Sequence, residues 1–178
     1  MSNLAVSSVT SDSLQQELEQ LFRENYQMLY RTAYSILDNS ADAEDVPQSI
    51  FLRILRSGMT PDLQKNAKPY LYRAAVNLSL NIIRSRKRHA LNSGAEDIQV
   101  PLDAPDSNSV EDSHRRLAEA IAELDPEAAQ ILILRYMHNY SDAKIAKLLG
   151  SSRGAIAMRL FRSRARLKKL MRHSSGEK

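Results

Sequence analysis

Apolar residues recur every three or four positions along most of this sequence, and no segment sustains the alternation of a half-buried strand. This period places apolar side chains on one face of a helix. The clearest stripe predicts a helix over residues 14–37, with these members: Leu18, Phe22, Leu29, Ala33 and Leu37. With 178 residues, the chain is therefore expected to be all-α and to form two small helical domains.

The rest of the first half divides into two further predicted helices. The second helix should begin after Ser40, which can cap it, and end at Ser57. Pro47 falls inside this pattern, where it lacks the amide hydrogen that a helix interior needs, and should bend the helix or shift its start. Residues 59–68 form a predicted polar loop, and Pro69 suits the first turn of a helix that runs to about residue 88.

Residues 91–113 interrupt the helical pattern with glycine, prolines and several serines and aspartates, which is typical of an interdomain linker. Two more helices are predicted, over about 110–124 and from the Asp125–Pro126 start signal to about Met137. The expected organisation is a disordered N-terminus, a first domain, a linker, a second domain and a tail, with these limits: 1–12, 13–90, 91–110, 111–173 and 174–178.

The segment from Ser141 to Arg172 has the pattern of a helix-turn-helix. Ser141 can cap a short helix, Gly150 suits the left-handed residue that ends it, and Ser152 can cap the next helix. In the second helix, one face is formed by Ile156, Leu160, Ser163 and Leu167, and the first three of these should pack on the preceding helices. Its opposite face would fit the major groove of DNA, where arginines contact phosphates and other side chains read base edges or thymine methyls.

Charge is segregated along the chain although the net charge is only +4. Residues 65–89 contain seven basic residues and no acidic one, and residues 143–176 contain ten basic residues and no acidic one. Residues 90–114, between them, contain six acidic residues and no basic one. Two separate basic blocks favour nucleic-acid binding over ordinary solvated helix faces.

The sequence offers no signal for catalysis, a cofactor or a metal site. It contains no cysteine, its four histidines are scattered, and it has no glycine-rich phosphate loop. Residues 1–12 are serine-rich and lack the basic start of a secretory signal, and no apolar run could span a bilayer. The expectation is a cytoplasmic protein that is not an enzyme and does not insert into a membrane.

Four motifs, in order, resemble the extracytoplasmic-function (ECF) sigma factors, group 4 of the sigma-70 family. They are DAEDVPQSIFLRIL at 42–55, PYLYRAAVNLSLNIIRSRKR at 69–88, LDPEAAQILILRY at 124–136 and KIAKLLGSSRGAIAMRLFRSRARL at 144–167. The resemblance implies a sigma region 2 domain, a flexible acidic linker and a sigma region 4 helix-turn-helix domain. It implies an alternative sigma factor that binds core RNA polymerase and directs it to promoters for transcription initiation.

The resemblance also implies roles for individual residues. Docking on the β′ clamp helices of the polymerase would involve Asp45, Gln48, Ser49 and Phe51. Recognition and melting of the −10 element would involve Asn77, Asn81, Arg84 and Lys87, with Lys65, Asn66 and Tyr70 as neighbours. Reading of the −35 element would involve Arg153, Gly154, Ala157, Met158, Phe161 and Arg162.

Other partners implied by the resemblance are the β flap of the polymerase and an anti-sigma factor, with the protein at the nucleoid when bound to polymerase. The sequence departs from the family pattern at several positions. Proline replaces an aliphatic residue at Pro47, Asn81 stands where aspartate is common, and Tyr70 stands where tryptophan is common. Ala155 and Ala157 replace frequent polar residues, which favours a larger contribution of DNA shape to −35 specificity.

Two other functions fit the residues. A self-sufficient dimeric repressor would bind a palindrome tightly without polymerase. A membrane-surface or scaffold protein would use the basic helices to bind acidic vesicles without any promoter-dependent transcription.

Overall fold

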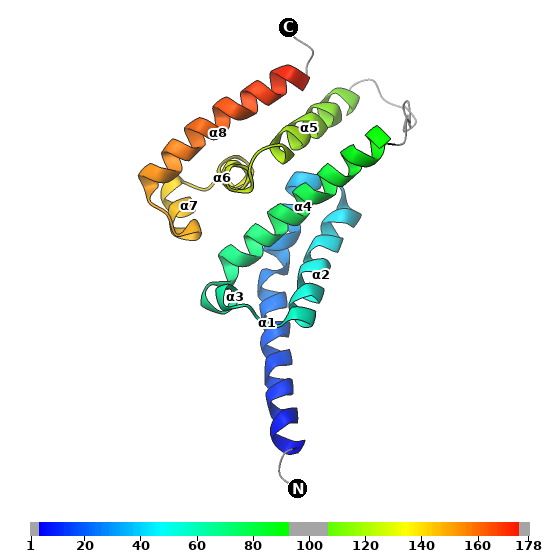
Figure 1. The fold of residues 1–178 in the computed structure, drawn as a ribbon, viewed down its shortest axis with the longest axis vertical. Coiled ribbons are helices and arrows are strands. Elements are labelled where there is room, and N and C mark those ends of the chain that lie inside the picture. Colours follow the sequence, from blue (N-terminus) through cyan, green and yellow to red (C-terminus); the bar gives the residue numbers. More distant parts are fainter. Residues whose placement is uncertain (1–3, 93–106, 175–178) are drawn as a thin grey trace. The chain divides into compact units, whose positions relative to one another are not determined.

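The computed structural model describes residues 4–92 and 107–174, and within these ranges every regular element is a helix (Figure 1). The side chains described are those of residues 16–92 and 110–172. This confirms the all-α fold class. Most of the predicted linker lies outside the described residues.

The first three helices are α1 (Leu4–Leu37), α2 (Ser40–Ser57) and α3 (Pro61–Lys65). Helix α1 begins ten residues before the predicted start at Leu14, so residues 4–12, expected to be disordered, are helical here. These residues include no proline or glycine that would break a helix. Asn39, and not Ser40, caps α2, because its side chain accepts a hydrogen bond from the Asp42 amide at 3.0 Å.

Helix α3 lies where a polar loop was predicted, so that prediction was wrong. Its start signals are local. The Thr60 hydroxyl accepts from the Leu63 amide, Pro61 is the first helical residue, and Asp62 places negative charge in the first turn. Leu63 is buried and fixes the short helix to the core.

The remaining helices are α4 (Ala67–Asn92), α5 (Ser107–Ala122), α6 (Pro126–Tyr136), α7 (Asp142–Leu149) and α8 (Arg153–Ser174). The predicted caps of α6 and α7 are confirmed. Asp125 accepts from the Ala128 amide at 2.9 Å, and Ser141 accepts from the Lys144 amide at 3.3 Å. Gly150 ends α7 in the left-handed conformation, with φ 64°.

The chain separates into two compact units. The first comprises residues 1–34 and 38–75, and the second comprises residues 35–37 and 76–178, so α1 and α4 each contribute to both. In the first unit the predicted stripes of α1 and α2 are largely buried, as shown by Leu29, Val46 and Ile50. Tyr72 is also buried, as expected for a core residue and not a nucleic-acid contact.

In the second unit, α8 packs against α5, α6 and α7, and α6 packs against α7. The core consists of fully buried apolar side chains from three of these helices, among them Ile131, Leu134, Ile145, Ile156 and Leu160. The capped starts of α6 and α7 therefore fix two short helices whose apolar faces converge with that of the longer α8 on one core. This arrangement leaves the opposite face of α8 towards solvent.

Pro47 is buried in the middle of α2, and the helix continues through it. We predict that Pro47→Val raises the free energy of unfolding of the first unit by about 1–3 kcal/mol, because valine restores the amide hydrogen that proline lacks. Chemical denaturation monitored by circular dichroism measures the change. Binding to core polymerase should be preserved or strengthened.

The matched control is Pro69→Val, since Pro69 is also buried but lies in the first turn of α4, where an amide has no partner within the helix. This substitution should change stability much less. A marked loss of stability or of polymerase binding in Pro47→Val would mean that the proline is a required feature of α2.

Candidate nucleic-acid and polymerase interfaces

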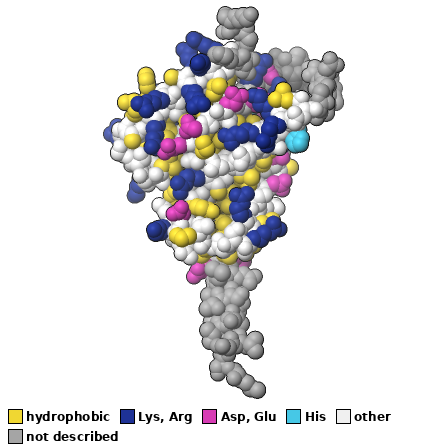
Figure 2. Space-filling model, viewed as in Figure 1, with side chains coloured by type: hydrophobic (Ala, Val, Ile, Leu, Met, Phe, Trp, Pro, Cys, Tyr) yellow, Lys and Arg dark blue, Asp and Glu magenta, His cyan; other side chains and the backbone are white. Residues whose placement is uncertain are grey.

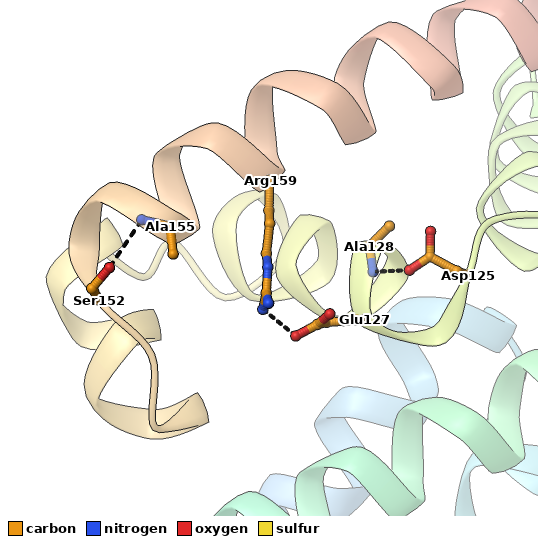
Figure 3. A network of polar contacts seen from close by, with 6 residues as sticks. All are labelled: Asp125, Glu127, Ala128, Ser152, Ala155 and Arg159. Carbon is orange, nitrogen blue, oxygen red and sulfur yellow. Dashed lines mark hydrogen bonds and ion pairs between the residues drawn. The ribbon is translucent and has the colours of Figure 1, made fainter.

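Helix α8 presents the face that the sequence predicted for DNA. Its start is fixed by Ser152, whose hydroxyl accepts a hydrogen bond from the Ala155 amide at 3.1 Å (Figure 3). Ile156, Leu160 and Ser163 are buried, as predicted. All six residues predicted to meet the −35 element are exposed: Arg153, Gly154, Ala157, Met158, Phe161 and Arg162.

Ion pairs to the start of α6 hold one edge of α8. Arg159 pairs with Glu127, although the two residues are 32 positions apart in the sequence (Figure 3). Arg166 lies 3.9 Å from Asp125, the residue that caps α6. Asp125 caps α6 and Glu127 lies in its first turn. The two pairs therefore connect α8 to the N-terminal end of α6. Sequence reasoning missed these pairs, since nothing local links α6 to α8.

The basic charge on this unit is visible at the surface. Figure 2 shows Lys and Arg side chains interspersed with hydrophobic ones over the part of the visible face where α8 lies in Figure 1. Phe161 is 70% exposed and Met158 is 53% exposed, which is unusual for side chains of this size. The exposed face of α8 thus combines apolar contact groups with a basic surround.

The turn between α6 and α7 orients the helix-turn-helix. Arg135 donates a hydrogen bond to the Tyr140 carbonyl at 3.0 Å and lies 3.6 Å from a carboxylate oxygen of Asp142. Asn139 adopts a left-handed conformation, with φ 55°, which asparagine tolerates better than most residues. The ammonium group of Lys144 lies 3.7 Å from the centre of the Tyr140 ring.

The second unit also has an apolar groove of about 600 Å³, and none of the six residues predicted for the −35 element lines it. Helices α5, α6 and α8 line it, with Ile121, Leu132, Tyr136, Leu167 and Met171 among the lining residues. Arg164 lies at its edge, 5.8 Å from the centre of the Tyr136 ring. The sequence analysis did not identify this groove.

The residues predicted to dock on the polymerase lie along α2. Asp45, Gln48 and Ser49 are exposed, but Phe51 is only 7% exposed because it packs edge-on against Phe22, with ring centroids 4.4 Å apart. Both rings line an apolar groove of about 450 Å³, with these other residues: Leu18, Glu19, Gln48, Leu52 and Leu55. Phe51 therefore lines the wall of this groove and does not project from the surface.

The residues predicted for the −10 element lie in or just before α4. Lys65, Asn66, Asn81 and Lys87 are exposed, and the rest are half-buried: Tyr70, Asn77 and Arg84. Three of the seven, Asn81, Arg84 and Lys87, make contacts within the second unit. Arg84 donates to the Ala122 carbonyl at 2.7 Å and to Asn81 at 2.9 Å.

Lys87 pairs with Glu123 at 2.5 Å. This hydrogen bond to a carboxylate raises the pKa of Lys87 above its ordinary value. Nucleic acid that used Arg84 or Lys87 would compete with these protein contacts.

Among the residues that the structure describes, no three His, Asp or Glu side chains gather as metal ligands would. None of the helices in the described ranges combines the length and apolarity that crossing a bilayer requires.

Two family models match the chain. Sigma-70 region 2 matches residues 21–89, and sigma-70 region 4 matches residues 114–167. The first match covers α2, α3 and most of α1 and α4, and the second covers α6, α7 and most of α5 and α8. The two matches together cover more than half of the chain, which therefore belongs to the sigma-70 family.

The relatives narrow this class. The chain is 31% identical over 167 residues to the ECF RNA polymerase sigma factor SigE of Mycolicibacterium smegmatis, an alignment that spans 88% of this chain and 63% of the relative. It is 26% identical over 160 residues to the RNA polymerase sigma factor CarQ of Myxococcus xanthus, covering 90% of this chain and 92% of that one. This chain belongs to the ECF sigma factors.

One solved structure similar to this chain is the sigma factor RpoE in complex with the anti-sigma factor NepR from Bartonella quintana. The identity is 21%, the match covers 90% of this chain and 97% of that chain, and the TM-score is 0.45.

His138, in the turn after α6, is half-buried, and this burial lowers its pKa from the ordinary value of 6.5. The unfolded chain therefore binds a proton more readily than the folded one. We predict that burial of neutral His138 adds to the free energy of unfolding. This contribution is fully present above about pH 6.5 and is lost as the pH falls below that value.

Thermal midpoints of the wild type and of His138→Gln, measured by circular dichroism from pH 7.5 to pH 5.5, test this. The wild type should lose stability relative to the variant as the pH falls. Parallel curves for the wild type and His138→Gln would contradict the assignment.

Proposed function

We propose that this chain binds core RNA polymerase and directs it to promoters through a bipartite grip on DNA. The first family region, over residues 21–89, would dock on the β′ clamp helices and recognise and melt the −10 element. The second, over residues 114–167, would read the −35 element through α8. The single observation that carries the proposal is the exposure of all six predicted −35 residues opposite the buried face of α8.

The two apolar grooves support a role in assembly with polymerase. The groove on α1 and α2 contains Gln48 and Phe51, two of the residues assigned to the β′ clamp helices. The groove on α5, α6 and α8 is the candidate site for the β flap, since it is apolar and contains none of the six residues assigned to the −35 element. Contacts with polymerase and with DNA would then use separate surfaces.

The proposed limits of the domains are 13–90 and 111–173, and the proposed location is the cytoplasm, at the nucleoid when the chain is bound to polymerase. The polymerase would carry out the chemistry, and this chain would supply only recognition and melting. An anti-sigma factor is a further proposed partner.

Transcription from a promoter library, with core polymerase in the presence and absence of the chain, tests the proposal. The chain should select promoters with two conserved blocks, and it should bind them well only with core polymerase. Tight binding of a palindrome by the pure protein would favour a dimeric repressor. Binding to acidic vesicles without promoter-dependent transcription would favour a membrane-surface protein.

Arg162→Ala should weaken −35 function without changing the affinity for core polymerase. Arg162 is exposed on α8 next to Phe161, and loss of a hydrogen bond to a charged phosphate costs about 1.5–3 kcal/mol. Promoter binding by the reconstituted holoenzyme and core binding by the free chain are measured separately.

The control is Arg115→Ala, which removes an arginine of equal charge from α5, where Arg115 pairs with Asp112 at 2.6 Å. It should change neither measurement substantially. An equal loss of promoter binding and core binding in Arg162→Ala would refute the assignment of α8 to DNA.

A further inference from the structure

The exposed face of α8 is apolar where a DNA-reading helix usually carries hydrogen-bonding side chains. Phe161 is 70% exposed and Met158 is 53% exposed, and they lie three positions apart, so they are neighbours on one face. Gly154, Ala157 and Ala165 extend this face along the helix and are also exposed. We call these five residues the apolar face of α8.

The arginines of α8 differ in whether their side chains contact other parts of the second unit. Arg159 and Arg166 are engaged by Glu127 and Asp125 on one edge of the helix. Arg164 lies 5.8 Å from the centre of the Tyr136 ring and lines the groove between α5, α6 and α8. Arg153 and Arg162 are exposed beside the apolar face near its start and middle, and Lys168 is exposed further along the helix.

Charge complementarity identifies the occupant of this face. Residues 143–176 contain ten basic residues and no acidic one, so α8 is surrounded by positive charge. Duplex DNA supplies the matching negative charge from its phosphates and presents one type of apolar group in the major groove, the C5 methyl of thymine. Two large apolar side chains on an otherwise basic helix are also too few for the wide apolar face of a membrane-surface helix.

The fit of a helix into the groove also needs space along its contact face. A side chain added at Gly154 would meet no atom within 4 Å, so this end of α8 is open to solvent. The small residues Gly154 and Ala157 would let the helix approach the base edges closely, which brings Met158 and Phe161 within contact distance of groups on the groove floor.

We propose that α8 recognises thymine methyl groups in the upstream promoter element through Phe161 and Met158, with Arg153 and Arg162 fixing the register on the backbone. This inference rests on the proposed role of α8 in promoter binding. It goes further, because it names the chemical group that is read and assigns specificity to apolar contact in place of hydrogen bonding. It predicts that the upstream element contains at least one thymine whose replacement by uracil weakens promoter binding.

The test uses holoenzyme reconstituted from core polymerase and the full chain, on a promoter selected from the library. Each thymine of the upstream element is replaced in turn by deoxyuridine, which removes the methyl group and leaves base pairing unchanged. Loss of one buried methyl should weaken binding about fourfold at the contacted position. Phe161→Ala should weaken binding to the thymine promoter by a similar or larger factor.

The decisive result is the coupling between the two changes. On the deoxyuridine promoter, Phe161→Ala should cause little further loss, because the contact has already been removed. Val110→Ala is the matched control, since Val110 is a 70%-exposed apolar residue of α5 outside the apolar face. It should have no effect on either promoter, and deoxyuridine outside the two promoter elements should have none.

Three outcomes would overturn the inference. Deoxyuridine could leave binding unchanged at every upstream position, or its effect could add independently to that of Phe161→Ala. Alternatively, Phe161→Ala could reduce binding to core polymerase or to acidic vesicles and not to DNA, which would assign the apolar face to a protein or a membrane. Failure of the unmodified promoter to support transcription would refute the proposed function itself, and is thus distinguishable from failure of this inference.

Discussion

The burial of one face of α8 is the constraint on which the rest of the second unit depends. Ile156 is fully buried and Leu160 is 1% exposed, in the core that α8 forms with α5, α6 and α7. Each such side chain contributes about 1.5–3 kcal/mol by leaving water. Since side chains three and four positions apart share a helix face, this burial also determines which residues face solvent. The orientation of the candidate DNA reader is thus a consequence of core packing.

Polar contacts refine this orientation without supplying most of its stability. The Arg159–Glu127 pair is about half exposed at both ends, and exposed ion pairs contribute little to folding. The ion pairs instead distinguish among the basic side chains: acids at the start of α6 pair with Arg159 and Arg166 of α8, while Arg153 and Arg162 remain exposed to solvent. A uniformly basic segment in the sequence becomes, in three dimensions, a helix with distinct faces.

How far the sequence predicts the structure depends on the range of the signals. Asp125, Ser141, Gly150 and Ser152 act within one helical turn, and each was correctly assigned. Asn39 and Ser40 can both cap a helix, and a local pattern does not choose between them. The start of α1 at Leu4 was missed because its serine-rich sequence resembles a disordered tail.

Contacts between distant segments were beyond prediction from one sequence. The packing of Phe22 on Phe51, the Lys87–Glu123 pair and the two apolar grooves require segments that only the fold brings together. The exposure of the candidate −35 residues could be predicted because the buried face of α8 repeats at helical spacing. Their contacts with DNA could not, since these depend on a partner outside the chain.

The central claim is that one protein grips a promoter at two separate places. Site-specific photocrosslinking from residue 161 of α8 and from residue 81 of α4, in a holoenzyme–promoter complex, tests it most directly. The account predicts that residue 161 crosslinks to DNA near −35 and residue 81 crosslinks near −10. Crosslinks from both residues to the same element, or from residue 161 to polymerase and not to DNA, would contradict it.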